Sequence, residues 1–547
     1  MNSIDWRLAT PQYDQVIDST LSLLQYNSSS FSDLQPRLSA SLKRFVELDV
    51  LAPLMVINGA DTVYERRNIT NTLQQLTQKP IAYSESIEIN ELLGSYDVDS
   101  KEQIRTHSGL LEKYDNGYLV LSANAVLANP KLLIAIRSLL VGEQVNRVNT
   151  GKYSPSNPQA FKSSVRVILV GDRNQLGDLD YLDPSYSSSL TLFAEVEMDL
   201  RITQQTAITY LGYVAALVKE HKLPDLSPVA IQRFLTAGAR ICEEQHYAPL
   251  SSQWILSLIR ESAIESNAQT IDATHIDAVV EGRYYRESYL PNRALDDILE
   301  GQVLIQTQGE QVGQVNGLTV VDIPGHPVSY GEPARISCVI HFGDGDVSDV
   351  ERKAELGGNL HAKGMMIMQA FLSSALDLDE PFPYSASIVF EQSYSEVDGD
   401  SASLAELCAL VSALSGCKLK QSIAVTGAVD QFGRVQAVGG LNEKIEGFYY
   451  VCAHQGLTGL QGVVLPQSNL RHLSLHKDVI DSIKQGKFHI WSVENVDQAL
   501  PIITGQEFRG DDSETLLNKI AERIDRLSHH DLDEKWLNRL KRMLFKD

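Results

Sequence analysis

The first residue whose setting suggests chemistry is Ser401, in the run VDGDSASLAELCALVSALSG. The segment before it is expected to be a strand and the segment after it a helix, because the following apolar residues have helical spacing: Leu404, Leu407, Val411 and Leu414. Ser401 would then stand at a helix N-terminus, where free backbone N–H groups and the helix dipole favour negative charge. A tetrahedral oxyanion needs such donors, so the position suits a nucleophile. The alternative is that Ser401 or Asp400 only caps the helix.

A lysine further along the chain, Lys444, stands in the first turn of a second expected helix. The run before it, SIAVTGAVDQFGRVQAV, is typical of two strands joined by a turn. A helical face follows: Leu441, Ile445, Phe448 and Cys452. A lysine near a helix N-terminus loses its proton more easily than usual, and burial acts in the same direction. To work as a base near neutral pH its pKa must fall by ~3 units, a cost of about 4 kcal/mol that desolvation can supply. The alternative is a solvated lysine paired with Glu443 or Glu446.

Together these segments resemble the proteolytic domain of the Lon family, in its archaeal-type branch and the related bacterial Lon-like proteins, over roughly Gly301 to Leu500. DGDSAS matches the nucleophile motif of the family with Ser401 at the serine position. GGLNEK matches the lysine motif with Lys444 at the catalytic position, 43 residues later. The resemblance implies a serine endopeptidase in which Lys444 takes the proton of the Ser401 hydroxyl as it attacks a peptide carbonyl, without a metal.

Two further residues fall where the family places an Asp and a Thr close to the dyad: Asp398 and Thr426. Thr426 could hydrogen-bond to the Lys444 amine and orient it. Asp398 would position the loop or modulate the lysine, and the alternative is an Asp that only forms a turn. His361, in GGNLHAKGMMIMQAFL, is interpreted as a structural residue at a helix start and not as a catalytic one.

The elements that must position these residues indicate an α/β multidomain chain, in which a degenerate AAA+-like α/β domain and a helical lid precede an α+β Lon-type proteolytic domain. Apolar runs alternate with helical segments before residue 200, as in a parallel sheet, whereas the next 90 residues are almost all helical. Alternating, glycine-broken sequence after Ile298 predicts hairpins. The predicted domains are an extension (1–40), the AAA+-like domain (41–200), the lid (201–290), the protease domain (291–505) and C-terminal amphipathic helices (506–547).

The loop that should hold nucleotide phosphates departs from the resemblance. A phosphate loop needs a glycine-rich turn, a Lys and a Ser or Thr. After the strand LMVIN the chain reads GADTVYERRN, with one glycine, Gly59, and with Tyr64, Glu65 and Arg66 about where Gly-Lys-Ser/Thr should be. A carboxylate there would repel phosphate.

Other nucleotide-handling positions are also altered. Ser122 and Ala123 replace the Asp-Glu pair that holds magnesium, and Gln253 stands near the usual arginine, although Asn174 is retained in the sensor segment. We therefore predict that no cofactor is needed for the chemistry. The ATP and magnesium of the family would have lost their site, and the ATPase fold would remain as a scaffold.

The amino-acid composition indicates which classes of partner and which cell compartment to expect. The 547 residues are 43% hydrophobic and 21% charged, typical of folded soluble chains. Lys plus Arg number 47 against 70 Asp plus Glu, and a net charge of −23 disfavours nucleic acid. Five widely spaced cysteines fit free thiols in a reducing compartment. Neither a signal peptide nor a membrane-spanning run of ~18 apolar residues is recognised, so cytoplasm is the expected location.

The leading hypothesis is an endopeptidase that degrades unfolded or flexible proteins without ATP-driven unfolding. The alternatives are an ATP-dependent Lon homologue with an unorthodox nucleotide site, and a non-catalytic adaptor or holdase. The resemblance implies a homo-oligomer, a hexameric ring in the family. The basic C-terminal stretch KWLNRLKRMLFKD could attach to a membrane, but an oligomer contact or a docked helix is the preferred interpretation.

Overall fold

A computed structural model of the chain describes residues 3–48, 54–99, 103–153, 160–184, 191–343, 347–376, 384–393, 398–510, 512 and 514–524. These residues form two compact units. The N-terminal unit contains the described residues of 13–238 and 247–279. The C-terminal unit contains residues 3–12, 239–246 and the described residues from 280 onward.

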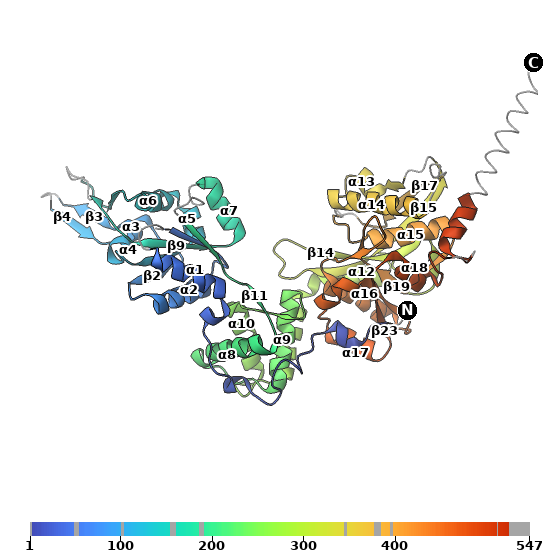
Figure 1. The fold of residues 1–547 in the computed structure, drawn as a ribbon, viewed down its shortest axis with the longest axis horizontal. Coiled ribbons are helices and arrows are strands. Elements are labelled where there is room, and N and C mark those ends of the chain that lie inside the picture. The colour runs from blue at the N-terminus through green and yellow to red at the C-terminus, as the bar shows by residue number, and fades with distance from the viewer. Residues whose placement is uncertain are drawn as a thin grey trace, which may run out of the picture. The chain divides into compact units, whose positions relative to one another are not determined.

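A five-stranded parallel sheet forms the centre of the N-terminal unit, with strand order β10-β1-β9-β5-β2. The strands are β1 (Leu54–Asn58), β2 (Ile81–Ser84), β5 (Tyr118–Ser122), β9 (Arg166–Gly171) and β10 (Thr191–Glu195). The three central strands are continuous apolar runs because helices cover both faces of such a sheet. Figure 1 shows α5 (Ala123–Ala128) and α6 (Pro130–Leu140) on one side, and α1 (Pro36–Glu47) and α2 (Val63–Leu76) on the other. The predicted α/β domain is confirmed.

Smaller elements complete this part of the N-terminal unit. A three-stranded sheet has the order β4-β3-β7, and β6 pairs with β8. Their bounds are β3 (Ser95–Val98), β4 (Ile104–His107), β6 (Val145–Asn146), β7 (Val148–Asn149) and β8 (Ala160–Phe161), with helices α3 (Ile89–Leu93), α4 (Leu110–Lys113) and α7 (Arg173–Leu182).

Four helices follow the sheet, in the region that the sequence predicts to be almost all helical. They are α8 (Gln204–Glu220), α9 (Pro228–Cys242), α10 (Ser252–Glu265) and α11 (Ala273–Glu287). The region also contains a short strand, β12 (Tyr247–Pro249), which pairs antiparallel with β11 (Asp199–Arg201). Helix α9 begins in the N-terminal unit, and its last turn, from residue 239, belongs to the C-terminal unit.

A seven-stranded mixed sheet forms the centre of the C-terminal unit, with strand order β16-β17-β15-β14-β19-β22-β23. The strands are β14 (Gln314–Val321), β15 (Tyr330–Phe342), β16 (Val347–Asp349), β17 (Tyr384–Phe390), β19 (Ile423–Val425), β22 (Gln461–Pro466) and β23 (Phe488–Val493). β14 and β15 form the predicted antiparallel hairpin, whereas β14, β19, β22 and β23 run parallel to one another. β13 (Glu310–Val312) pairs with β18 (Lys418–Lys420), and β20 (Ala428–Val429) with β21 (Val435–Gln436).

Two separate cores lie on the two faces of this sheet. Val425 and Val464 face a core with helix α15 (Ser403–Ser415), whereas Ala424 and Val463 face a core with helix α16 (Leu441–Gln455). Neighbouring strand residues point to opposite faces, so α15 and α16 cover opposite sides of the sheet. The other helices of the unit are α12 (Tyr289–Leu299), α13 (Val350–Lys353), α14 (Asn359–Leu376), α17 (Lys477–Lys484) and α18 (Val496–Thr504).

The first described residues of the chain pack within the C-terminal unit. The backbone N–H of Ile4 donates to the Ile490 carbonyl (2.9 Å), and that of Leu475 donates to the Ala9 carbonyl (3.2 Å). Ala9 is fully buried in the same core as α16. The predicted extension 1–40 is thus shared, because residues from 13 onward belong to the N-terminal unit.

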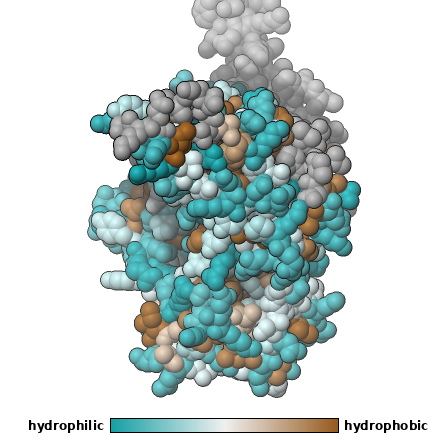
Figure 2. Space-filling view, turned by 90° about the vertical axis from the view of Figure 1, so that its left-hand side faces the viewer, coloured by the Kyte–Doolittle hydropathy of each residue, from teal (hydrophilic) through white to brown (hydrophobic). Residues whose placement is uncertain are grey.

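The predicted amphipathic C-terminal helix is described up to residue 524. Residues 516–524 are helical, with Leu516 and Ile520 buried. The rest of the predicted C-terminal helices, including the basic stretch KWLNRLKRMLFKD, lies outside the described residues. None of the described helices combines the length and the apolar character needed to cross a bilayer. In the face drawn in Figure 2, hydrophilic residues predominate and hydrophobic ones are scattered among them.

Candidate functional site

Ser401 lies two residues before the first residue of α15, in a tightly bonded loop. Ala402 occupies the N-cap position. The Ser403 hydroxyl donates to the Asp400 carbonyl (2.8 Å) and accepts from the Val429 N–H (3.0 Å), which ties the loop to β20. The Ser401 side chain therefore does not cap the helix, and its hydroxyl is left for another partner.

The carbonyl of Ser401 is held from the segment that follows β19. It accepts from the Gly427 N–H (2.9 Å) and from the Thr426 hydroxyl (3.3 Å). Gly427 has φ +148°, a conformation that L side chains rarely adopt, and a Cβ there would meet Val435 Cγ1 at 3.0 Å. The recorded partner of the Thr426 hydroxyl is thus the Ser401 backbone and not the Lys444 amine that we expected. The contact of Thr426 is therefore with the serine, and its role beside Lys444 stays a prediction.

Lys444 is the fourth residue of α16, and its side chain points to Ser401. The helix begins after Gly440, which has φ +63° and no room for a side chain, because a Cβ there would meet Val320 Cγ2 at 2.5 Å. Lys444 is only 4% exposed. Its Nζ lies 2.9 Å from Ser401 Oγ, within hydrogen-bonding distance.

The environment of Lys444 makes its ammonium group easier to deprotonate than that of an exposed lysine. Burial lowers the pKa of Lys444 to about 8, and the nearby Asp400 carboxylate opposes this shift. A lysine with this pKa is partly neutral at pH 7 to 8 and can take a proton from a hydroxyl. The influence of Asp400 was missed in the sequence, where we considered this residue only as a cap.

The two side chains meet although their helices cover opposite faces of the sheet. Ser401 precedes α15 and Lys444 lies in the first turn of α16, so the N-terminal ends of both helices must lie at the same end of the sheet. That end is the carboxyl end of β19, where Thr426 and Gly427 hold the serine. Such an edge is where open sheets with parallel strands commonly place their sites.

The backbone of α16 lies directly on β15 at the turn that carries Lys444. A Cβ at Gly331 of β15 would lie 2.0 Å from the Glu443 carbonyl oxygen, and a Cβ at Gly447 of α16 would lie 2.0 Å from the Gly331 carbonyl oxygen. Both distances are far below van der Waals contact. The position of Lys444 therefore depends on two residues without side chains.

The hydrogen bonds of Asp398 are with backbone N–H groups and not with Lys444. Its Oδ1 accepts from the Gly399 N–H (2.9 Å) and from the Leu360 N–H at the start of α14 (3.2 Å). Gly358 lies against this carboxylate, where a Cβ would approach Oδ1 to 2.2 Å. These contacts agree with the loop-positioning interpretation of Asp398.

His361 belongs to a buried ionisable cluster that we did not foresee. Its Nε2 lies 3.2 Å from Asp349 Oδ2 and its Nδ1 lies 3.6 Å from Glu406 Oε1. Burial lowers the pKa of His361, but the two carboxylates outweigh it and raise the pKa overall. Burial raises the pKa of Glu406 to about 7, against the influence of His361. The sequence did contain a signal for this cluster, because Glu406 is a charged residue inside the apolar helix that follows Ser401.

In the N-terminal unit, Asp61 bonds the loop between β1 and α2 to both α2 and β5. The Arg66 side chain is fully buried and forms an ion pair with Asp61. Asp61 also accepts from the Ser122 hydroxyl at the end of β5 (2.6 Å). Glu65 is buried, and burial raises its pKa to about 7.

Two other positions that we compared with nucleotide-handling residues lie at the surface. Asn174 is exposed in α7, beyond the end of β9, and Gln253 is exposed in α10. Within the described ranges, no group of three or more His, Cys, Asp and Glu side chains is arranged to hold a metal ion.

Family models match both units of the chain. Residues 389–504 match the C-terminal proteolytic domain of Lon protease (S16), and residues 77–197 match the LonB-like AAA domain. The first match contains Ser401, Thr426 and Lys444.

Curated proteins from three organisms are similar to the chain. A "Putative Lon protease homolog" of Escherichia coli strain K12 is 38% identical over 97% of this chain and 97% of its own length. A protein of the same name from Haemophilus influenzae is 38% identical over 80% of this chain and 74% of its own length. An "Archaeal Lon protease" of Thermococcus kodakarensis is 24% identical over 77% of this chain and 64% of its own length.

Proposed function

Because this chain belongs to the Lon protease family, we propose that it is a serine endopeptidase whose nucleophile is Ser401 and whose general base is Lys444. The observation that carries the proposal is the 2.9 Å contact between Lys444 Nζ and Ser401 Oγ, made by a buried lysine. A solvated lysine paired with Glu443 or Glu446 would not make this contact.

In each half of the proposed reaction, Lys444 first accepts a proton and then donates it. Neutral Lys444 takes the hydroxyl proton while Ser401 Oγ bonds to the peptide carbonyl carbon. The ammonium then gives this proton to the leaving nitrogen as the C–N bond breaks and an acyl-enzyme remains. Water attacks the ester carbonyl while Lys444 takes its proton, and the ammonium returns this proton to Ser401 Oγ as the peptide acid leaves.

The pH dependence of hydrolysis follows from this role of Lys444. The group must be neutral to accept a proton, and its pKa is about 8. We expect kcat/KM for a peptide substrate to fall about tenfold for each pH unit below that value and to level off above it. A profile that stays flat from pH 6 to 9 would show that Lys444 is not the base.

We further propose that the N-terminal unit does not drive unfolding by ATP hydrolysis. The family relationship implies ATP and magnesium, but the loop between β1 and α2 does not fit a triphosphate. Arg66 pairs with Asp61 and with Glu85, and Asp61 also accepts from Ser122, which ends the strand that would carry the metal ligands. Glu65 would add negative charge near any phosphate above its pKa of about 7.

A degradation assay tests both proposals. The purified full chain is incubated with a fluorescently labelled unfolded protein, with and without ATP and magnesium, beside the Ser401→Ala variant. We expect hydrolysis that ATP does not accelerate and that is absent in the variant. Hydrolysis only with ATP would overturn the nucleotide proposal, whereas substrate binding without hydrolysis under any condition would favour an adaptor or holdase.

The proposed substrates are unfolded or flexible proteins, and the proposed assembly is a homo-oligomer. Both rest on membership of the family. The charge of −23 opposes a role in nucleic-acid binding.

A further inference from the structure

Arg240 lies in the last turn of α9 and is bonded to the helix that carries Lys444. This turn belongs to the C-terminal unit, although α9 begins in the other unit. The region is predicted to be a helical lid, and nothing in the sequence around Arg240 indicates a role for it. The Arg240 side chain is 31% exposed, and the side chains of its partners Glu443 and Glu446 are less exposed still.

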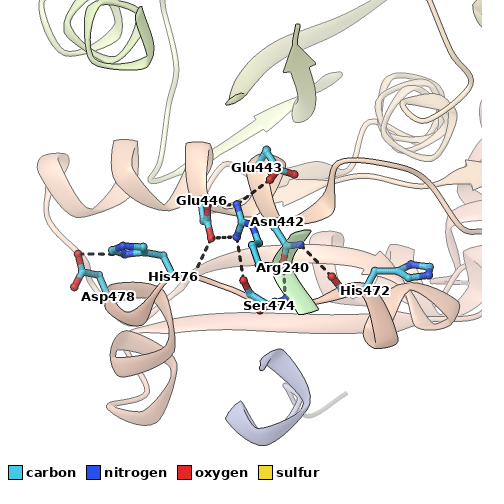
Figure 3. Close-up of polar contacts among 8 residues, drawn as sticks. All are labelled: Arg240, Asn442, Glu443, Glu446, His472, Ser474, His476 and Asp478. Atoms are coloured by element: carbon cyan, nitrogen blue, oxygen red, sulfur yellow. Dashed lines mark hydrogen bonds and ion pairs between the residues drawn. The ribbon is translucent and has the colours of Figure 1, made fainter. Parts of the chain in front are cut away.

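The guanidinium bridges two carboxylates of α16, as Figure 3 shows. Nη1 donates to Glu446 Oε1 (2.7 Å), while Nη2 donates to Glu446 Oε2 (3.0 Å) and to Glu443 Oε1 (2.8 Å). This is a two-bond fork on Glu446 with a third bond to Glu443, a geometry that a lysine cannot reproduce. Lys444 lies between these two glutamates in the sequence.

The same side of α16 is fastened to the segment that follows β22. Asn442 Nδ2 donates to the His472 carbonyl (3.0 Å), and Asn442 Oδ1 accepts from the Ser474 N–H (2.7 Å). Glu446 Oε1 also accepts from the His476 N–H (2.8 Å), and Arg240 Nη1 donates to the Ser474 carbonyl (3.0 Å). In Figure 3 these residues surround the Arg240 guanidinium, which occupies the centre of the network.

The charges of this network depend on Arg240. Burial lowers the pKa of Arg240, but Glu446 and Glu443 outweigh it and raise the pKa overall, so the group is a permanent cation. Burial raises the pKa of Glu443, and Arg240 opposes that shift. Without Arg240, two partly buried carboxylates would have lost their counterion, and hydration would draw the first turns of α16 towards water.

We propose that Arg240 is a positioning residue for the peptidase reaction, which holds the first two turns of α16 in place so that Lys444 stays buried beside Ser401. The inference rests on the proposed function, because it concerns the same dyad. Arg240 acts through α16, because its hydrogen bonds go to Glu443, Glu446 and Ser474 and not to Ser401 or Lys444. Burial is what makes Lys444 a base, so loosening of α16 would raise its pKa.

A purely structural ion pair would behave differently from a positioning residue. Its loss would lower stability and the yield of folded enzyme, but the folded fraction would keep its pH profile. A positioning role requires the acid limb of the pH profile, the side on which kcat/KM falls as Lys444 becomes protonated, to move when Arg240 is substituted. It also requires kcat to fall while KM stays the same, because Arg240 does not contact the substrate.

The decisive variant is Arg240→Met, which keeps an apolar stem and removes the charge. We expect kcat/KM at pH 7.5 to fall about tenfold through kcat, and the acid limb to move upward by roughly half a pH unit. Arg240→Lys keeps the charge but cannot form the two-bond fork, so it should move the acid limb by a smaller amount. This variant provides the test if Arg240→Met does not fold. The neutral triple variant Arg240→Met/Glu443→Gln/Glu446→Gln should return the acid limb towards that of the parent.

A matched control is Arg509→Met in the same unit. Arg509 makes a two-bond pair with Asp497 (2.6 and 3.0 Å) that does not involve α16. This variant should keep the parent pH profile. An unmoved acid limb in Arg240→Met and Arg240→Lys, or an equal shift in Arg509→Met, would overturn the proposal.

A second measurement separates this inference from the proposed function. The rate at which trace acetic anhydride labels Lys444 at each pH reports its pKa without turnover. An upward shift in Arg240→Met with no hydrolysis by any variant would support the positioning of Lys444 and reject the peptidase. Hydrolysis by the parent with identical labelling curves for parent and variant would reject the role of Arg240 and leave the peptidase standing.

Discussion

Ser401→Ala is expected to lower kcat/KM for peptide hydrolysis by about 10⁴-fold or more, because it removes the proposed nucleophile, the oxygen that would form the acyl-enzyme. The fold should tolerate the change. Ser401 is held through its carbonyl by Gly427 and Thr426, and its hydroxyl does not cap α15. Kinetics on a fluorogenic peptide, with circular dichroism as the check on folding, would measure the effect.

Substitutions of Lys444 test the proposed pair from the side of its base. Lys444→Met should be as damaging as Ser401→Ala, because a buried methionine fills similar space without a proton acceptor. Lys444→Arg should also be inactive, because a guanidinium stays protonated at every pH of the assay. The two losses should not multiply in the double variant, since both residues serve one step.

Thr426→Ser is the matched control for the dyad variants. It keeps the hydroxyl that donates to the Ser401 carbonyl and should retain most of the activity. Full activity of Lys444→Met would reject the proposed base. Full activity of Ser401→Ala would show that hydrolysis comes from elsewhere in the chain or from a contaminant.

Gly447→Ala is expected to lower kcat/KM by roughly 100-fold, since a displacement of the order of 1 Å is enough to misalign a catalytic pair. The added Cβ would lie 2.0 Å from the Gly331 carbonyl oxygen and 2.5 Å from its carbon. This neighbour is backbone of β15, which is hydrogen-bonded to β14 and cannot turn aside like a side chain. Helix α16 must therefore move, and Lys444 moves with it.

The expected change in stability is opposite in sign to that of an ordinary Gly→Ala substitution in a helix, which makes the test strict. Within a helix, Gly→Ala normally stabilises by about 1 kcal/mol. Here the clash should outweigh that gain and destabilise the unit by about 1–3 kcal/mol. Denaturant unfolding of the inactive Ser401→Ala background with and without Gly447→Ala would measure this difference without interference from self-digestion.

Gly439→Ala is the control, because a Cβ at Gly439 would meet nothing within 4 Å and this residue directly precedes the Gly440 cap of α16. It should leave activity and stability almost unchanged. Parent-like kinetics for Gly447→Ala would show that the contact between α16 and β15 can relax without disturbing Ser401 and Lys444. The position of α16 on β15 would then not determine activity.

Local signals in the sequence were enough to predict the elements that carry the dyad. Helical spacing after Ser401 and around Lys444 predicted α15 and α16, because one apolar face repeats every three to four residues whatever the rest of the chain does. The parallel sheet of the N-terminal unit was equally visible, since strands buried on both faces must be apolar throughout. Family resemblance added the pairing of Ser401 with Lys444, which spacing alone could not supply.

Only the tertiary structure decided how these elements meet. The order of strands in the sheet places α15 and α16 on opposite faces and brings both N-terminal ends to the end of β19. The partner of Thr426 changed from the expected Lys444 amine to the Ser401 carbonyl for the same reason. Arg240 reaches Glu443 and Glu446 across about 200 residues of sequence. Periodicity and propensity describe neighbours within one element, whereas contacts between distant segments depend on the packing of the whole sheet.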